Sequence, residues 1–66
     1  MKISANGTDF DVEQDCSLSD FLESIGHRIG MVVVERNREA LSPSEAKDTI
    51  LEEGDSLEIV KIVAGG

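Results

Sequence analysis

The sequence predicts an α+β fold in which one main helix packs on one face of a mixed sheet of four to five strands. Three patterns carry this prediction. Apolar and polar residues alternate around an Asn-Gly pair in residues 1–12, which is typical of half-buried strands joined by a tight turn. A single apolar stripe at helical spacing follows in residues 18–25. β-Branched residues then gather in residues 31–34 and near the end of the chain.

The first two strands are predicted at residues 1–5 and 8–12, with Asn6-Gly7 as the turn between them. Asn-Gly favours a type I′ turn because both central positions of that turn need positive φ. A two-residue loop fixes the strand register and leaves one face of the hairpin apolar. The cross-strand pairs predicted on that face are Ala5–Thr8, Ile3–Phe10 and Met1–Val12.

The main helix is predicted between Leu18 and Ile25, because its apolar residues fall at i, i+3, i+4 and i+7. Ser17 precedes this stripe and is a candidate N-cap, whose hydroxyl accepts a hydrogen bond from a free backbone N–H. Gly26 is placed to end the helix in the left-handed conformation.

The middle of the chain is predicted to hold a further strand and a short helix. The run Met31–Val34 predicts a strand that is covered on both faces or nearly so. Asn37-Arg38 indicates a turn, and Leu41 closes a short extended piece. Ser42 as N-cap and a proline at the first helical position predict a short helical turn over Pro43–Lys47.

Ile50 and Leu51 are expected to anchor the following segment to the core. A turn at Glu53-Gly54-Asp55 then leads into a last strand at Ser56–Val63. This order of elements describes a β-grasp, in which the first and last strands pair in parallel at the centre of the sheet.

The length of 66 residues suits a single small domain, predicted at residues 1–63 with residues 64–66 as a flexible tail. Acidic residues number 14 and basic residues 6, which gives a net charge of −8. This balance argues against a nucleic-acid partner, because phosphate neutralisation needs an excess of Lys and Arg. The sequence contains neither a membrane-spanning apolar run nor a signal-peptide pattern, so we expect no membrane association and a cytoplasmic location.

Candidate catalytic groups are few. Cys16 is the only cysteine and His27 the only histidine, which argues against a cysteine-based zinc site or iron–sulfur cluster in this chain. Cys16 is interpreted as a half-buried loop residue and His27 as a surface residue at a helix end. The carboxylates lack the ordered spacing of a calcium loop. We therefore expect the chain to bind no cofactor or metal by itself.

The sequence ends in Gly65-Gly66, directly after the predicted last strand. A terminal carboxylate with no side chains beside it can enter the narrow active site of another protein, and glycine adopts backbone angles that other residues resist. The accompanying motifs are the Asn6-Gly7 hairpin, the Leu18–Ile25 helix, Val33–Asn37, Leu41-Ser42-Pro43, Glu53-Gly54-Asp55 and Ile59–Gly66. In this order, and over the whole chain, they resemble the ThiS group of ubiquitin-like sulfur carrier proteins.

The resemblance implies that the chain is a protein substrate rather than an enzyme. An adenylating enzyme of the ThiF/MoeB type would use ATP and magnesium to convert the Gly66 carboxylate to an acyl-adenylate. A persulfide-bearing donor would then leave a thiocarboxylate on Gly66, with Gly65 providing access. Thiazole synthase would accept this sulfur for the thiazole ring of thiamine.

The last strand provides a separate prediction. If Leu57 and Ile59 point into the core, Val60 and Ile62 point outward beside the tail. Two such aliphatic side chains next to the reactive end suggest a docking patch. The alternative is that the chain itself covers this part of the sheet. The residues expected to bind the adenylating enzyme are Val60, Ile62, Ala64 and Gly65.

Other functions stay open at this point. A MoaD-like carrier would donate sulfur to the molybdenum cofactor precursor, but that branch tends to be longer and to carry a proline-bearing segment before Gly-Gly. The only proline here is Pro43, which favours the thiamine branch. Sulfur carriers for cysteine synthesis or tRNA thiolation, and conjugation to proteins through an isopeptide bond, are further possibilities. A different class is a non-catalytic β-grasp interaction module whose tail carries no chemistry.

Overall fold

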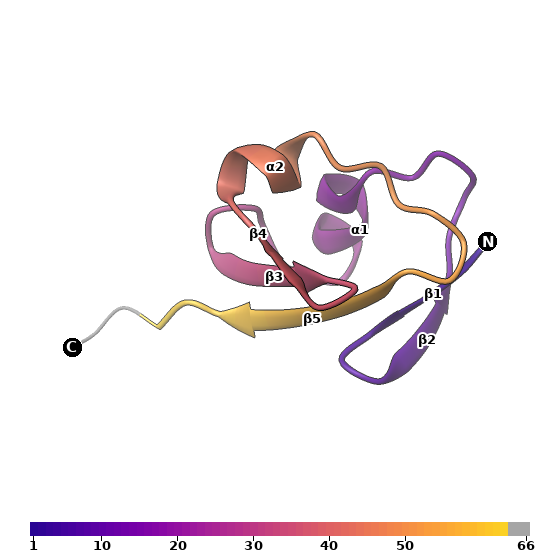
Figure 1. Cartoon of the computed structure of the whole chain (residues 1–66), viewed down its shortest axis with the longest axis horizontal. Coiled ribbons are helices and arrows are strands. Elements are labelled where there is room, and N and C mark those ends of the chain that lie inside the picture. Colours follow the sequence, from indigo (N-terminus) through magenta and orange to yellow (C-terminus); the bar gives the residue numbers. More distant parts are fainter. Residues whose placement is uncertain (64–66) are drawn as a thin grey trace.

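Five strands form one mixed sheet in the order β2-β1-β5-β3-β4, with two helices, in a computed structural model that describes residues 1–63 (Figure 1). The strands are β1 (Lys2–Ala5), β2 (Thr8–Asp11), β3 (Val32–Arg36), β4 (Glu39–Leu41) and β5 (Ser56–Lys61), and the helices are α1 (Leu18–Ser24) and α2 (Pro43–Lys47). The predicted β-grasp is confirmed. Residues 1–63 as a single domain stay a prediction, and the predicted flexible tail at residues 64–66 lies outside the described residues.

Strand β5 lies at the centre of the sheet, as predicted. It runs parallel to β1, with Ala5 beside Leu57, and antiparallel to β3, with Val34 beside Ile59. Leu57 and Ile59 are buried. The last strand of the chain therefore joins the N-terminal hairpin to the β3–β4 hairpin.

The predicted register of the first hairpin is confirmed. Ile3 lies opposite Phe10, and Ala5 lies opposite Thr8. Asn6 has a φ of 51°, and Gly7, the second central residue of the turn, has a φ of 81°. Both values are positive, as a type I′ turn requires.

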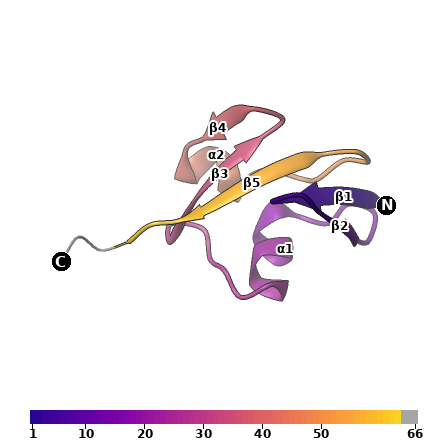
Figure 2. The same ribbon diagram turned by 90° about the horizontal axis from the view of Figure 1, so that it is seen from below.

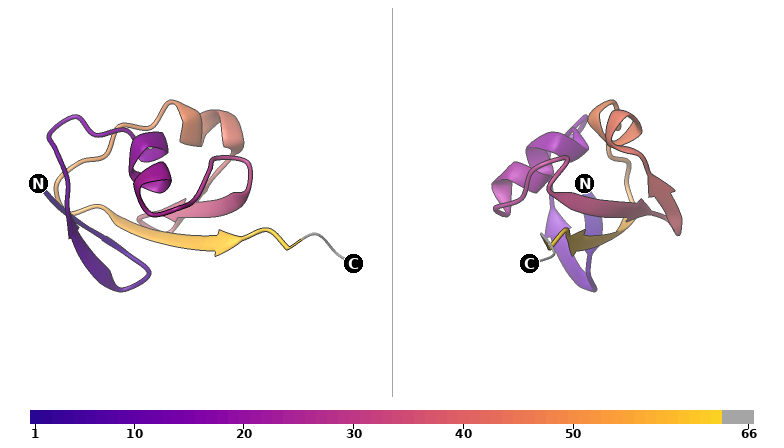
Figure 3. Two further views of the ribbon diagram at one scale, coloured as in Figure 1. Left: turned by 180° about the vertical axis from the view of Figure 1, so that it is seen from behind. Right: turned by 90° about the vertical axis from the view of Figure 1, so that its left-hand side faces the viewer.

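Both helices pack on the same face of the sheet, and the core lies between the two layers (Figures 1 and 3). The buried apolar residues come from both helices, three strands and the segment before β5. They are Ile3, Ala5, Leu18, Phe21, Leu22, Val32, Val34, Ala46, Leu51, Leu57 and Ile59.

Helix α1 has the ends that the sequence predicted. The Ser17 hydroxyl accepts a hydrogen bond from the Asp20 N–H at 3.0 Å, which satisfies one of the free donors of the first turn. At the other end, Gly26 has a φ of 87° and the His27 N–H donates to the Leu22 carbonyl at 2.8 Å. This is the Schellman pattern, which stops the helix at its predicted glycine.

Helix α2 also matches its prediction. The Ser42 hydroxyl accepts from the Glu45 N–H at 3.2 Å, and the Glu45 carboxylate accepts from the Ser42 N–H at 2.8 Å. This capping box and Pro43 favour the start of the helix. A helix of 5 residues is not stable by itself, so the burial of Ala46 against the core is also needed.

The prediction that the strand at Met31–Val34 is covered on both faces is wrong. Val32 and Val34 are buried, but Met31 is 63% exposed and Val33 is 47% exposed. The physical reason is that both helices lie on one face of the sheet, so alternate residues of β3 face solvent. The run of β-branched residues correctly predicted a strand, but it carried no information on which faces of that strand are covered.

Two further expectations need correction. Leu51 is buried as expected, but Ile50 is 49% exposed, because successive residues of an extended segment point to opposite sides. The last strand ends at Lys61 rather than Val63, since β3 begins at Val32, which is the residue opposite Lys61.

A buried carboxylate before β5, which the sequence pattern did not single out, holds the Glu53-Gly54-Asp55 turn in place. Asp55 is 5% exposed and accepts hydrogen bonds from Arg36 Nε at 3.0 Å, from Asn37 Nδ2 at 3.0 Å and from the Glu52 N–H at 2.8 Å. Burial by itself would raise the pKa of Asp55, but these hydrogen bonds and the Arg36 charge outweigh burial and hold the pKa below its ordinary value. This network fixes the start of β5 against the end of β3.

Asp55→Ala should lower the free energy of unfolding by about 2 kcal/mol, because it leaves a partly buried guanidinium and an amide without their acceptor. Urea denaturation of both proteins measures this change, with Asp9→Ala as the control at an exposed carboxylate. The difference should be present at neutral pH and shrink as the pH falls below about 4, since a carboxyl with a depressed folded pKa loses its contribution in acid. A pH-independent difference would contradict the ionic part of this account.

Candidate functional site

The end of β5 is the part of the fold at which the sequence-predicted site residues gather. Figure 2 shows β5 running through the middle of the sheet; it extends past the end of β1 and ends beside Val32, the first residue of β3. Val60 lies within β5, and Ile62 follows it directly. Of the other predicted site residues, Ala64, Gly65 and Gly66 lie outside the described residues.

An exposed apolar surface lies where the chain leaves the sheet. Val60 pairs directly with Val33 on the face that the helices do not cover. Two residues after Val60, the Ile62 N–H donates to the Met31 carbonyl at 3.1 Å. The exposed fractions of these side chains are 62% for Val60, 47% for Val33, 53% for Ile62 and 63% for Met31. We call these four residues the tail-root patch.

The prediction that Val60 and Ile62 are exposed is confirmed, but the sequence reasoning missed Met31 and Val33. A cluster of exposed aliphatic side chains on neighbouring strands is unusual for an isolated surface and is typical of interaction sites. The signal that could have found the other two residues is the antiparallel register between β3 and β5, which places Val33 opposite Val60. That register is not visible in either segment alone.

Charged side chains of opposite sign border the two sides of the tail-root patch. Glu35 and Glu58, both exposed, lie directly opposite each other one pair before Val33 and Val60 on the same face. On the other side, Arg28 and Lys61 line a hollow with His27 next to the root of the tail. The surface around the tail therefore has an apolar centre, an acidic border along the sheet and a basic border at the α1–β3 loop.

The side chain of Asn6 binds the backbone of β5 just before the tail. Its Oδ1 accepts from the Ile59 N–H at 2.7 Å, and its Nδ2 donates to the Ile59 carbonyl at 3.1 Å. Strand β1 ends at Ala5, so the amide of Asn6 continues the β1–β5 pairing by one further step. The residue that the sequence identified as a turn former also holds the end of the central strand.

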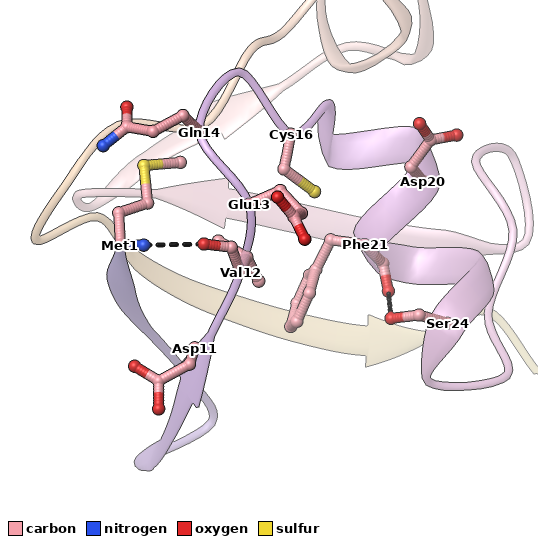
Figure 4. A pocket seen from close by; sticks show the side chains of 9 residues that line it. All are labelled: Met1, Asp11, Val12, Glu13, Gln14, Cys16, Asp20, Phe21 and Ser24. Atoms are coloured by element: carbon pink, nitrogen blue, oxygen red, sulfur yellow. Dashed lines mark hydrogen bonds between the residues drawn. The ribbon is translucent and has the colours of Figure 1, made fainter.

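Cys16 lies away from the tail, in an open hollow between the β2–α1 connection and helix α1 (Figure 4). Its Sγ donates to the Ser17 carbonyl at 3.4 Å. Burial, followed by the nearby Asp20 and Glu13 carboxylates, raises the pKa of the Cys16 thiol. A raised pKa lowers the thiolate population at neutral pH, which argues against a nucleophilic role.

The prediction of a half-buried loop cysteine is confirmed, whereas His27, predicted at the surface, is partly buried. The two residues lie at opposite ends of α1, so they do not form a Cys–His pair. Within residues 1–63, no group of three His, Cys, Asp or Glu side chains is arranged to hold a metal ion. Neither helix in this part of the chain has the length and apolar character needed to span a bilayer.

Comparison with known proteins agrees with this geometry. A model of the ThiS family matches residues 2–66. The chain belongs to the ThiS family. A crystal structure of the thiamine biosynthesis protein ThiS from Geobacter metallireducens is similar to it, with a TM-score of 0.80, 25% identity and full coverage of both chains. The resemblance identified from the sequence motifs is thus confirmed at the level of the family.

A second relative is longer. Thiazole synthase of Magnetococcus marinus is 33% identical over 66 residues, a match that covers all of this chain and 20% of that protein. The chain thus spans about a fifth of the length of this relative. A ThiS-like segment therefore occurs there within a larger polypeptide.

Asn6→Gly should weaken the hold on β5 without straining the turn, because glycine adopts positive φ freely. We expect the free energy of unfolding to fall by about 1–2 kcal/mol through loss of the two hydrogen bonds to Ile59. Asp15→Gly is the matched control, since Asp15 is exposed and also has a positive φ, of 62°. Amide exchange at Ile59 should accelerate in Asn6→Gly and not in Asp15→Gly. Unchanged exchange at Ile59 would contradict the role of the Asn6 side chain in holding β5.

Proposed function

We propose that this chain is a cytoplasmic sulfur carrier for thiamine biosynthesis and acts as a protein substrate rather than as an enzyme. The observation that carries the proposal is the ThiS family match over residues 2–66, which includes Gly65-Gly66. The central position of β5 supports it, because a strand paired on both sides leads toward this end of the chain (Figure 2). The family match also favours the thiamine branch over a molybdenum-cofactor carrier.

The reacting group in this proposal is the carboxylate of Gly66. A carboxylate resists attack by a nucleophile because it has no good leaving group. A ThiF/MoeB-like partner would activate it with ATP and magnesium: a carboxylate oxygen attacks the α-phosphorus, pyrophosphate leaves and an acyl-adenylate forms. The nucleotide and the metal ion would be bound by the partner, and this chain would contribute the carboxylate.

The second step installs the sulfur. The terminal sulfur of a persulfide donor attacks the acyl carbon and displaces AMP, forming an acyl disulfide. A second thiol then breaks the sulfur–sulfur bond, which leaves a thiocarboxylate on Gly66 and a disulfide on the donor side. Gly65 has no side chain to obstruct either attack.

Thiazole synthase is the proposed acceptor of the sulfur. The support is the thiazole synthase of Magnetococcus marinus, which contains a segment 33% identical to this chain. A carrier segment within the polypeptide of its acceptor would raise the effective concentration of one for the other. We propose that the ThiS-like fold of this chain makes the same kind of contact with thiazole synthase.

The tail-root patch is the proposed docking surface for the adenylating partner. Val60 and Ile62, the sequence-predicted residues, supply half of it, and Met31 and Val33 supply the rest. Ala64 and Gly65 would follow the chain into the active site of the partner. The patch includes Ile62, which lies four residues before Gly66 in the sequence, so its burial would bring the Gly66 carboxylate within reach of the docked active site.

The carrier reaction can be tested by intact-mass spectrometry after incubation with ATP, magnesium, the adenylating partner and a persulfide donor. We expect an exchange of one oxygen for sulfur, localised to Gly66 by fragmentation. A chain lacking Gly65-Gly66 should show no exchange, whereas Cys16→Ala should be converted like the wild type, because the Cys16 thiol takes no part. If the wild type stays unmodified under conditions that convert a known carrier, the non-catalytic module is the better reading.

Val60→Asp and Ile62→Asp should each lower kcat/KM for adenylation about tenfold or more, mainly through KM, because each places a charge in a contact that buries an aliphatic side chain. The matched control is Ile50→Asp, which changes an aliphatic residue of similar exposure, 49%, outside the patch. Circular dichroism checks that all three variants fold. Wild-type kinetics in the two patch variants would remove the docking role of these residues.

A further inference from the structure

We propose that the adenylating partner binds this chain by adding an extended segment to an open edge of β5 that begins at Lys61. The proposal rests on the proposed function and specifies how the partner is recognised. It follows from the directions in which the backbone groups of β5 point and from where the neighbouring strand ends.

Backbone groups of β5 alternate between its two neighbours. The carbonyls of Asp55 and Leu57 accept from the N–H groups of Ser4 and Asn6, both at 2.9 Å, so these residues of β5 bond toward β1. The next residue on that side, Ile59, is bound by the Asn6 side chain through both its N–H and its carbonyl. Residues at every second position therefore bond on the β1 side.

Residues at the intervening positions bond toward β3. The Asn37 N–H donates to the Ser56 carbonyl at 2.8 Å, and the Ile62 N–H donates to the Met31 carbonyl at 3.1 Å. Lys61 lies opposite Val32 between such pairs, and its backbone N–H and carbonyl point away from β3. Val63, two residues further on, makes no backbone hydrogen bond within residues 1–63.

No strand among residues 1–63 pairs with Lys61 on the β1 side of β5. Strand β1 ends at Ala5, and the chain reverses at Asn6-Gly7 into β2 (Figure 1). The last β1-side bond to β5 is therefore the one that the Asn6 side chain makes at Ile59. In the described part of the chain, the backbone N–H and carbonyl of Lys61 have no hydrogen-bond partner. A central strand thus becomes an edge strand at the point where the tail begins.

Addition of a strand to an exposed edge is a common way to bind a peptide segment, in which main-chain hydrogen bonds supply affinity and alternate side chains supply specificity. Aliphatic and basic side chains both lie beside this edge. One face carries Val60, and the other carries Lys61 with Arg28 at the hollow, which Met31 and Ile62 of the tail-root patch also line. The fitting segment therefore carries apolar residues, for the patch, together with acidic residues, for the two cations.

A second copy of this chain fits the edge poorly. Two copies paired through β5 would bring Lys61 close to its own equivalent, and each copy carries a net charge of −8. A lysine on an exposed edge is a recognised barrier to self-pairing. The charges therefore exclude like chains and favour a partner that supplies carboxylates.

Amide hydrogen exchange tests the edge directly. In the free chain, the Val60 and Ile62 amides should exchange more slowly than those of Lys61 and Val63, because only the former two bond to β3. After exchange in the complex with the adenylating enzyme, followed by acid quenching and residue-resolved detection, the Lys61 amide should be protected at least tenfold. If Gly66 is adenylated while Lys61 exchanges as in the free chain, the edge proposal fails and the carrier function stands. If no adenylation occurs with a competent partner, the carrier function itself fails.

A proline at position 61 distinguishes the contribution of the Lys61 backbone N–H from that of the Lys61 side chain. Lys61→Pro removes an N–H that the β3 ladder does not use, so the fold should persist, as circular dichroism and the Val60 amide can verify. We expect kcat/KM for adenylation to fall at least tenfold below that of Lys61→Ala, which removes the side chain but keeps the N–H. Equal kcat/KM values for these two variants would overturn the proposal. So would slower exchange of the Lys61 amide at higher concentrations of the isolated chain, because the edge would then pair with a second copy.

Discussion

The pairing of β5 with β1 on one side and β3 on the other is the interaction on which the rest of the structure depends. It joins two hairpins that are far apart in the sequence, and its register decides that Leu57 and Ile59 enter the core while Val60 faces outward. Side chains secure it near both ends: the Asp55 network holds the start of β5, and the Asn6 amide holds Ile59. The strand that leads toward the proposed reactive end is therefore anchored at the centre of the sheet.

The small size of the chain has a second consequence. Two short helices cover one face of the sheet, and the opposite face stays open to solvent (Figure 3). On most of that face the exposed residues are polar or charged, but where β3 and β5 approach the tail they are aliphatic. The proposed carrier function needs such a surface close to the reactive group, and the one-sided fold leaves this surface uncovered.

The distribution of charge is consistent with this division of roles. Arg36 is used inside the fold, where it bonds to Asp55 and Glu52, whereas Arg28 and Lys61 lie at the root of the tail. The chain has a net charge of −8, so two cations at the root of the tail make this region more basic than most of the surface. Charges of both signs around an apolar centre orient a docked protein more strictly than an apolar surface alone, and orientation matters when a single carboxylate has to reach an active site.

The sequence by itself determined the features whose causes are local. The Asn6-Gly7 turn needs positive φ, the stripe from Leu18 needs one apolar partner surface, and Ser42 with Glu45 caps the helix that begins at Pro43, so each element could be predicted within its own segment. The alternation in β5 likewise predicted the exposure of Val60 and Ile62.

Only the tertiary structure decided which face of β3 the helices cover, and hence that Met31 and Val33 join the patch. It also decided that Asp55 is buried, that Asn6 reaches Ile59 and that pairing with β1 stops before Lys61. These features depend on contacts between segments distant in the chain, and no local pattern encodes the register that brings those segments together.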